Sequence, residues 1–334
     1  DVVSAGSVGF KRATGGRGAN RMTFQLSAGA LRASGDGIVS LADRTADVAF
    51  SANAPAMQPS ADIAWASLAL RGHIRGSFDA PQIAAKLQAA GVKAAGTTLG
   101  EIDADVSGSH GTVDLAGTAS GIRIATDRPD LFASAPVFVT AHADLKSPSR
   151  PLRFSLSHPL AAIKGQVDTL GPTKLDADVT IPSLAPFAAL QGENVRGSAA
   201  FHVVATRDGQ KTGLALNGRI DAQGASLIAR ALGRTATLSL QAALDGSDIV
   251  ESKVSVQGVG LKMQAAGSFK NRILNASTKL DLPDLSRLAA TLRGTATLSG
   301  TAIGPLATAQ LHVSGSADMA SKGFVPQRVG LVMR

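Results

Sequence analysis

The chain of 334 residues has no cysteine, no tyrosine and a single tryptophan, Trp65. Without cysteine it can form no disulfide and offers no thiolate to a metal ion. No apolar run approaches the roughly 20 residues that a membrane-spanning helix needs. Aromatic residues make up only 4% of the chain. The sequence therefore lacks the aromatic platforms on which nucleic-acid bases stack.

Sequence patterns of catalysis and metal binding are missing as well. The histidines are scattered without the spacing of metal ligands, no H-E-x-x-H motif occurs, and no serine lies in G-x-S-x-G. The nearest local candidate combines Ser107 and Ser109 with His110 in a glycine-rich stretch, which we interpret as an ordinary turn. We therefore predict no catalytic residue, no metal site and no cofactor, and hence a protein that is not an enzyme.

Positive charge is in excess, with a net charge of +8 and a pI of about 10.1. Such a balance favours an anionic partner, either a nucleic acid or the head groups of anionic lipids. The basic residues are spread singly, and the densest cluster, Lys11, Arg12, Arg17 and Arg21, has no aromatic stacking platform beside it. We therefore expect no nucleic acid as a partner.

Carboxylates recur in pairs along the sequence. Asp103 and Asp105 alternate with apolar residues, and Asp176 and Asp178 repeat the pattern. One pair alone would suit a paired-acid or calcium site. Recurrence on different predicted strands instead indicates a solvated outer face.

The chain is rich in a period-two alternation of aliphatic and small polar residues. Hydrophobic residues make up 44% of it, and nearly all are Ala, Leu, Val or Ile. Because successive side chains of a strand point to opposite faces, each alternating stretch predicts a strand with one apolar and one wetted face. The pattern predicts about sixteen strands, over residues 22–30, 46–52, 83–89, 101–106, 112–119, 152–157, 163–168, 175–181, 199–205, 214–220, 237–244, 254–257, 259–265, 276–282, 295–302 and 309–317.

Short turn sequences join most of these strands, such as Gly35-Asp36-Gly37, Arg207-Asp208-Gly209 and Asp245-Gly246. Short connections favour antiparallel neighbours, so the sequence predicts an all-β meander. Two stretches, residues 183–190 and 284–292, favour short helices instead. Each begins at a candidate N-cap, Ser183 or Asp284. We expect their apolar residues to be buried against the sheet, namely Leu184, Phe187, Leu285 and Leu288.

Both helical stretches belong to an internal repeat with a period of about a hundred residues. The first follows Ile-Pro-Ser-Leu at residues 181–184 and precedes Arg196-Gly197-Ser198-Ala199. The second follows Leu-Pro-Asp-Leu at residues 282–285 and precedes Arg293-Gly294-Thr295-Ala296. A second recurring unit places Gly, Pro and Leu at the same spacing in residues 76–87 and 300–311.

The strand meander, these helical inserts and the Gly-Pro-Leu units resemble the TamB family within the AsmA-like proteins of Gram-negative bacteria. The resemblance covers most of residues 65–334 and is strongest over residues 282–317. Residues 1–64 share only the general strand-like pattern and not the motifs. We expect them to be N-terminal strands that can be continuous with one repeated domain over residues 65–334. The family's membrane anchor and C-terminal domain are not recognisable, and we expect a middle segment of a longer protein.

The resemblance implies a long, strongly curved antiparallel sheet that forms an open trough with an apolar inner face and two short helical inserts. It implies a protein of the periplasm, anchored to the inner membrane outside this segment, that conducts phospholipids between the inner and outer membranes. The alternative that it implies is a scaffold for the assembly and secretion of outer-membrane proteins with the outer-membrane partner TamA.

The aliphatic phase of the strands supplies the candidate binding residues. An apolar face without covering helices needs either a second sheet or lipid chains, and each buried CH₂ group contributes about 0.8 kcal/mol. A parallel β-helix would need coils of near-constant length, which the hairpin-like units disfavour. We predict that phospholipid acyl chains contact a groove lined by Leu238, Leu240, Val254, Val256, Leu261, Met263, Leu280, Leu311 and Val313.

Overall fold

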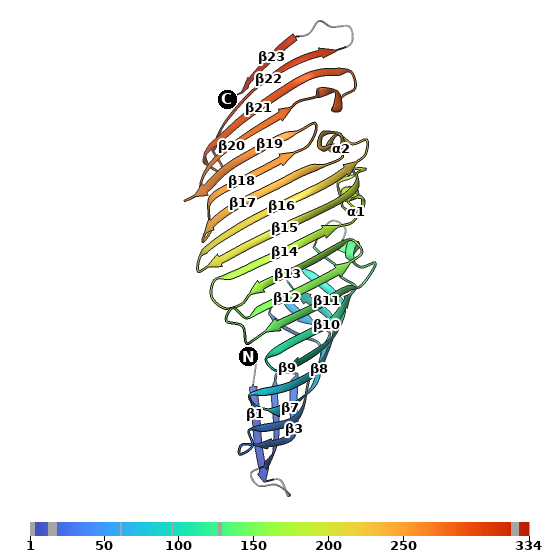
Figure 1. Ribbon diagram of the computed structural model, residues 1–334, viewed down its shortest axis with the longest axis vertical. Coiled ribbons are helices and arrows are strands. Elements are labelled where there is room, and N and C mark those ends of the chain that lie inside the picture. The colour runs from blue at the N-terminus through green and yellow to red at the C-terminus, as the bar shows by residue number, and fades with distance from the viewer. Residues whose placement is uncertain are drawn as a thin grey trace. The chain divides into compact units, whose positions relative to one another are not determined.

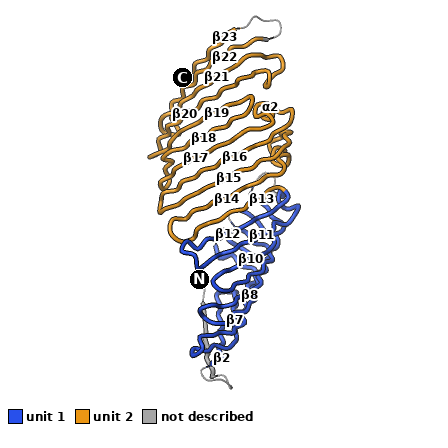
Figure 2. The backbone as a smooth tube through the Cα atoms, in the orientation of Figure 1, with its two compact units in different colours: residues 1–159 blue, residues 160–334 orange. Residues whose placement is uncertain are grey.

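A computed structural model describes residues 4–12, 19–60, 62–94, 96–125, 129–321 and 327–333 (Figure 1). The described part is all-β, and its strands pair in antiparallel fashion, as predicted. The chain divides into two compact units, residues 1–159 and 160–334 (Figure 2). The boundary expected after residue 64 falls inside the first unit, within β6 (Ile63–Trp65).

Unit 1 is an open antiparallel sheet. Most of its strands pair with their neighbours in the chain, but β4 pairs with β7 because the short β5 and β6 lie between them in sequence. β6 pairs instead with β5 and β8. The other strands of the unit are β1 (Ser4–Arg12), β2 (Ala19–Ala28), β3 (Leu31–Ser40), β4 (Thr45–Ala54), β5 (Met57–Ser60), β7 (Ser67–Ser77), β8 (Ala80–Ala94), β9 (Thr97–Ser109), β10 (Thr112–Ser120), β11 (Val137–Asp144) and β12 (Pro151–His158).

Unit 2 is an antiparallel meander in which each strand pairs with the next, from β13 to β23. Its first and last strands do not pair with each other in the described residues, so this sheet is open too. The strands are β13 (Ala161–Asp168), β14 (Thr173–Ile181), β15 (Arg196–Asp208), β16 (Lys211–Gln223), β17 (Ala236–Asp245), β18 (Asp248–Gln257), β19 (Lys262–Lys270), β20 (Ile273–Leu282), β21 (Leu292–Pro305), β22 (Gln310–Ser321) and β23 (Gln327–Met333).

All of the predicted strands overlap strands of the structure, although the stretch 259–265 reaches only the start of β19. The pattern missed β1, β3, β5, β6, β7, β11 and β23. In β3 and β7 the reason is glycine, because Gly35 and Gly72 occupy places of the apolar phase opposite Phe50 on β4. A glycine there interrupts the aliphatic alternation without ending the strand.

Two of the predicted turns are confirmed and one is wrong. Gly209 and Gly246 follow the last residues of β15 and β17 with φ of 58° and 59°. Gly35-Asp36-Gly37 lies in the middle of β3 instead. The ring of Phe24 occupies the space that a Cβ on Gly35 would take. The glycine thus serves side-chain packing between strands rather than a change of direction.

The predicted helices are shorter than expected. Residues 183–190 contain α1 (Ala185–Ala188) followed by the 3₁₀ turn η2 (Ala189–Gln191), whereas residues 284–292 contain only the 3₁₀ turn η3 (Leu285–Arg287). Asp284 is the N-cap of η3 and accepts a hydrogen bond of 3.0 Å from the Ser286 backbone N–H. Ser183 is not a cap, because α1 begins after Leu184 and has no side-chain cap.

Burial of the insert residues was predicted correctly for Leu285, which is 4% exposed. Leu184, Phe187 and Leu288 are only half-buried. Each insert is one or two turns long, so it covers the end of a strand pair rather than the sheet. A further short 3₁₀ turn, η1 (Pro129–Phe132), precedes β11 in unit 1.

A third helix, α2 (Leu227–Leu232), was missed by the sequence analysis. Ser226 caps it by accepting a hydrogen bond of 3.2 Å from the Ala229 N–H, and Gly233 ends it with φ of 73°. Both cap residues are visible in the sequence, but a helix of six residues is too short to show helical periodicity.

The inserts of unit 2 lie along one row of its strand ends, called here the insert edge, where α2 lies above α1 in the view of Figure 1. In an antiparallel meander every second connection returns to the same edge. A small apolar cluster is formed by the buried residues Val195, Ala222 and Ala229, the last of which belongs to α2. The partly buried Ala188 and Leu232 pack against this cluster. The opposite edge carries two-residue turns, as between Asp208 and Lys211.

The repeat at the two strand starts is confirmed by a shared backbone geometry. Gly197 and Gly294 have φ of 136° and 117°, and a Cβ at either would overlap the carbonyl of the neighbouring strand, that of Asp221 or Asp318. The Gly-Pro-Leu units, in contrast, are not one structure. Gly76 faces Pro81 across the hairpin of β7 and β8, whereas residues 300 and 305 both belong to β21.

We expect Gly197→Ala and Gly294→Ala to lower the thermal midpoint by at least twice as much as Gly209→Ala. A left-handed φ alone costs an alanine about 1 kcal/mol, which is the whole effect at Gly209, since nothing lies within 4 Å of its Cβ position. Gly197 and Gly294 add the overlap with a backbone carbonyl. Circular dichroism melting of the variants measures this, and equal shifts at all the positions would contradict it.

Candidate functional site

Strand register decides which residues share a face of the unit 2 sheet. Directly opposed residues of an antiparallel pair point to the same side. Leu238 is opposed by Val256, Val256 by Met263, and Met263 by Leu280. This row continues through Leu298 of β21. Aliphatic side chains from five consecutive strands therefore lie side by side on one face.

The other predicted groove residues lie on the same face in parallel rows. Leu240 opposes Val254, and that row crosses β19, β20 and β21 to reach Val313 on β22. Leu311 is two residues before Val313 on the same strand. Leu261 is the exception, because it lies just before β19, where its carbonyl accepts a hydrogen bond of 2.7 Å from the Gly258 N–H.

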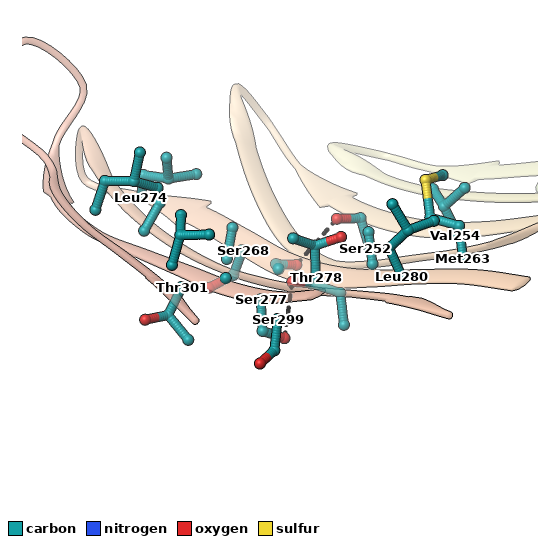
Figure 3. Close-up of a pocket in the computed structure, with 18 of the residues that line it drawn as sticks. Ser252, Val254, Met263, Ser268, Leu274, Ser277, Thr278, Leu280, Ser299 and Thr301 are labelled. Atoms are coloured by element: carbon teal, nitrogen blue, oxygen red, sulfur yellow. Dashed lines mark hydrogen bonds between the residues drawn. The ribbon is translucent and has the colours of Figure 1, made fainter. Parts of the chain in front are cut away.

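A shallow pocket of about 440 Å³ lies among β18 to β22. Five of the predicted residues line it, namely Val254, Met263, Leu280, Leu311 and Val313. Figure 3 shows Val254, Met263, Leu274 and Leu280 on one side of the strands and Ser299 and Thr301 on the other.

Sequence analysis did not select Leu274, Phe269 and Leu298, which also line this pocket. Leu298 sits in a predicted strand with the right phase. Leu274 and Phe269 lie beyond the predicted strand ends, and only the hairpin of β19 and β20, which opposes them directly, brings them to the pocket.

Hydroxyl groups on this face are turned toward the backbone. Ser252 Oγ donates to the Gly267 carbonyl at 3.0 Å (Figure 3). Thr278 Oγ1 donates to the Gln264 carbonyl at 3.3 Å. Each hydroxyl thus has its donor satisfied within the sheet. The pocket consequently offers methyl and methylene groups to a ligand and few free polar atoms.

An aromatic ring on the same face lies across a neighbouring strand instead of projecting from the sheet. Phe201 opposes Gly218, and its ring atoms occupy the space of a Cβ at that glycine. Phe24 lies in the same way over Gly35 in unit 1. These pairs keep each apolar face low in relief.

The aliphatic rows of unit 2 are only partly covered. Leu311 is 54% exposed, whereas row residues such as Leu238 and Met263 are half-buried, and no large side chain is fully buried among the residues whose burial the structure describes. The short inserts lie at the edge. A contiguous exposed apolar patch of this kind is typical of a surface that binds an apolar ligand or partner.

In each unit, the strand residues opposite in phase to the aliphatic ones include paired charges, which agrees with the solvated face expected from the recurring aspartates. In unit 1, Lys86 Nζ lies 2.9 Å from Asp103 Oδ1 and 4.0 Å from Asp105 Oδ1. In unit 2, His202 Nδ1–H donates to Asp178 Oδ1 at 2.9 Å, and His202 Nε2 lies 3.8 Å from Asp176. These side chains are 44 to 74% exposed, and such surface pairs contribute little stability.

The hydrogen bond to Asp178 raises the pKa of His202 above its ordinary 6.5, and burial opposes this only in part. A folded-state pKa above the unfolded value means that the pair stabilises the fold fully below pH about 6.5. That contribution is lost as the pH rises through the folded-state pKa.

We expect NMR titration of the histidine ring protons to give His202 a pKa above 6.5. Asp178→Asn should lower it, because the neutral amide no longer favours the imidazolium. Asp281→Asn, on the same face but on β20, should leave it unchanged. Titration of wild-type His202 at 6.5 or below would contradict the expectation.

The weaker catalytic candidates have ordinary structural roles. Ser109 ends β9, and His110 and Gly111 form the turn to β10 with φ of 52° and 81°. In the described part of the chain no group of three or more potential ligand side chains could hold a metal ion. Of the basic cluster, Arg17 lies outside the described residues, and Arg21 forms an ion pair of 2.6 Å with Asp36.

No helix in the described residues is long and apolar enough to cross a membrane. In comparisons with known proteins, no family model, no curated protein and no solved structure matches the chain.

Proposed function

We propose that this chain is a segment of a lipid-conducting protein whose apolar sheet face binds the acyl chains of phospholipids. The observation that carries the proposal is the set of aliphatic rows on one partly exposed face of unit 2, with Leu238, Val256, Met263 and Leu280 opposed strand by strand. Covering such a face with acyl chains is favourable by about 0.8 kcal/mol for each buried CH₂ group.

The low relief of the face supports a conduit rather than a fixed binding site. Ser252 and Thr278 direct their hydroxyl groups to backbone carbonyls, and Phe201 lies over Gly218. A ligand that slides along such a surface exchanges one set of methylene contacts for another of similar energy. We infer that the sheet curves into an open trough with this face inward.

The cellular setting follows from the resemblance to the TamB family. We propose a periplasmic location in a Gram-negative bacterium, attachment to the inner membrane through another part of the protein, and transport of phospholipids between the inner and outer membranes. The protein acts without catalytic residues, because moving a lipid breaks no covalent bond.

Charge placed on the apolar face should abolish lipid binding. We expect the double variant Leu240→Asp, Val256→Asp to retain at most about one tenth of the lipid that co-purifies with the wild type, because each carboxylate would be buried among acyl chains. Lipid extracted from the purified chain and quantified by mass spectrometry measures this.

The matched control is Ser239→Asp, Ser255→Asp, which adds the same charge to the same two strands on the opposite face, where the two serines oppose each other. It should retain most of its lipid. Equal loss in both double variants, or no lipid on the wild-type chain, would contradict the conduit.

A scaffold for outer-membrane proteins that works with TamA is the second candidate. The observation that favours it is β5 of unit 1, which pairs only with β6 in the described residues and so leaves its other side unpaired. An unpaired strand of this kind can accept a client strand. Such a scaffold would bind peptides from outer-membrane strands equally well in both double variants.

A further inference from the structure

Three arginines surround a second pocket at the insert edge of unit 2. Its volume is about 420 Å³. Arg230 comes from α2, Arg234 from the segment that leads into β17, and Arg287 from η3. Ser286 and Gln223 also line it. η3 is far from the other two segments in the sequence, and the meander brings it to the same edge.

Positive charge exceeds negative charge around this pocket. Arg287 Nε lies 3.4 Å from Asp284 Oδ2. Within the described part of the chain, Arg230 and Arg234 form no ion pair, and Arg230 Nε is shielded from water without a hydrogen-bond acceptor. A shielded guanidinium N–H is costly unless an acceptor reaches it, and an anion in the pocket would supply one.

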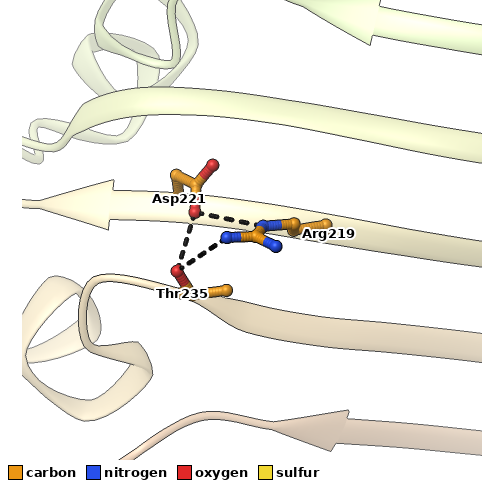
Figure 4. A network of polar contacts seen from close by, with 3 residues as sticks. All are labelled: Arg219, Asp221 and Thr235. Atoms are coloured by element: carbon orange, nitrogen blue, oxygen red, sulfur yellow. Dashed lines mark hydrogen bonds and ion pairs between the residues drawn. The ribbon is translucent and has the colours of Figure 1, made fainter.

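Hydrogen bonds anchor the segments that carry Arg230 and Arg234. Thr235, next to Arg234, donates to Asp221 at 2.9 Å and accepts from Arg219 Nη2 at 3.3 Å (Figure 4). The last carbonyls of α2 are already occupied, because Leu232 accepts from the Val259 N–H and Ala231 from the Gly260 N–H, at 3.2 and 2.9 Å. The negative end of this short helix is therefore covered by donors.

The pocket borders the apolar face. Ala222 lines it and lies on β16 two and four residues after Ile220 and Gly218, which puts all three on one side of the strand. Gly218 opposes Leu238, the first residue of the row that continues through Val256. An amphiphile could therefore place an anionic group among the arginines while its chains lie on the aliphatic rows.

We propose that this pocket binds a phosphate group, held by charge-assisted hydrogen bonds from the guanidinium groups of Arg230, Arg234 and Arg287. Guanidinium groups match phosphate in geometry and charge. The proposal rests on the proposed lipid function for the source of that phosphate, a phospholipid head group, whereas free inorganic phosphate offers the same chemistry.

The test uses the whole chain, delipidated, with dioleoylphosphatidate and dioleoylglycerol in uncharged detergent micelles, and with inorganic phosphate alone. The pocket variant is Arg230→Gln, Arg234→Gln, Arg287→Gln. The control is Arg207→Gln, Lys211→Gln, Arg272→Gln, which removes the same charge from the opposite edge, at the turns of β15 with β16 and of β19 with β20. Melting curves establish whether each variant folds. If the triple variant does not fold, the single variant Arg234→Gln replaces it, because Arg234 is exposed.

We expect the pocket variant to bind phosphatidate at least about tenfold more weakly than the wild type, and the control to change less than about twofold. Dioleoylglycerol should bind all proteins alike. Equal weakening in both variants, or none in the pocket variant, would overturn the phosphate site.

The two proposals fail in different ways. If dioleoylglycerol does not bind but phosphatidate binding still depends on the three arginines, the lipid face is wrong and the phosphate site is supported. If inorganic phosphate binds the wild type as tightly as phosphatidate and is lost in the pocket variant, the site is supported and the lipid head group is overturned as its source.

Discussion

The register of the antiparallel backbone ladder is the constraint on which the rest of unit 2 depends. Side-chain direction alternates along a strand, so a slip by one residue would move every aliphatic side chain to the wetted face. Among the described residues of unit 2, no second layer corrects such a slip, since each strand packs chiefly against its neighbours within the sheet. The two-residue turns, as between Asp208 and Lys211, and the left-handed glycines at Gly197 and Gly294 fix this register.

The register also determines which residues lie on the charged face and which lie on the apolar face of the unit 2 sheet. Surface pairs such as His202 with Asp178 are exposed and contribute little stability. They keep one face in water without holding the sheet together. On the other face, covering the hydroxyl groups of Ser252 and Thr278 with an apolar ligand would cost little free energy, because both already donate to backbone carbonyls. A ligand that covers it would stabilise the fold by the same contacts through which it binds.

Local alternation was enough to predict many of the strands, though not β3 or β7, and most of the residues in the aliphatic rows, because both depend on residues two positions apart. It was not enough where a residue's role depends on another strand. Gly35 reads as a turn residue until Phe24 is placed beside it. The pocket of Arg230 and Arg287 depends on contact between α2 and η3, which lie in separate connections. Contacts between such distant segments depend on the topology of the sheet, which a local sequence pattern does not encode.

The two long edges of unit 2 differ in mechanical stiffness. On one edge the turns are short, and a backbone hydrogen bond of 3.0 Å, from the Gly246 N–H to the Gln210 carbonyl, joins the β17–β18 turn to the β15–β16 turn. On the other, α2 contacts η3 and hydrogen-bonds to the Gly258–Gly260 loop, so longer connections are fastened together. Thermal bending is therefore resisted more strongly along the insert edge than along the turn edge. The sheet would therefore bend mainly along the turn edge, and the width of its apolar face would vary there more than at the insert edge.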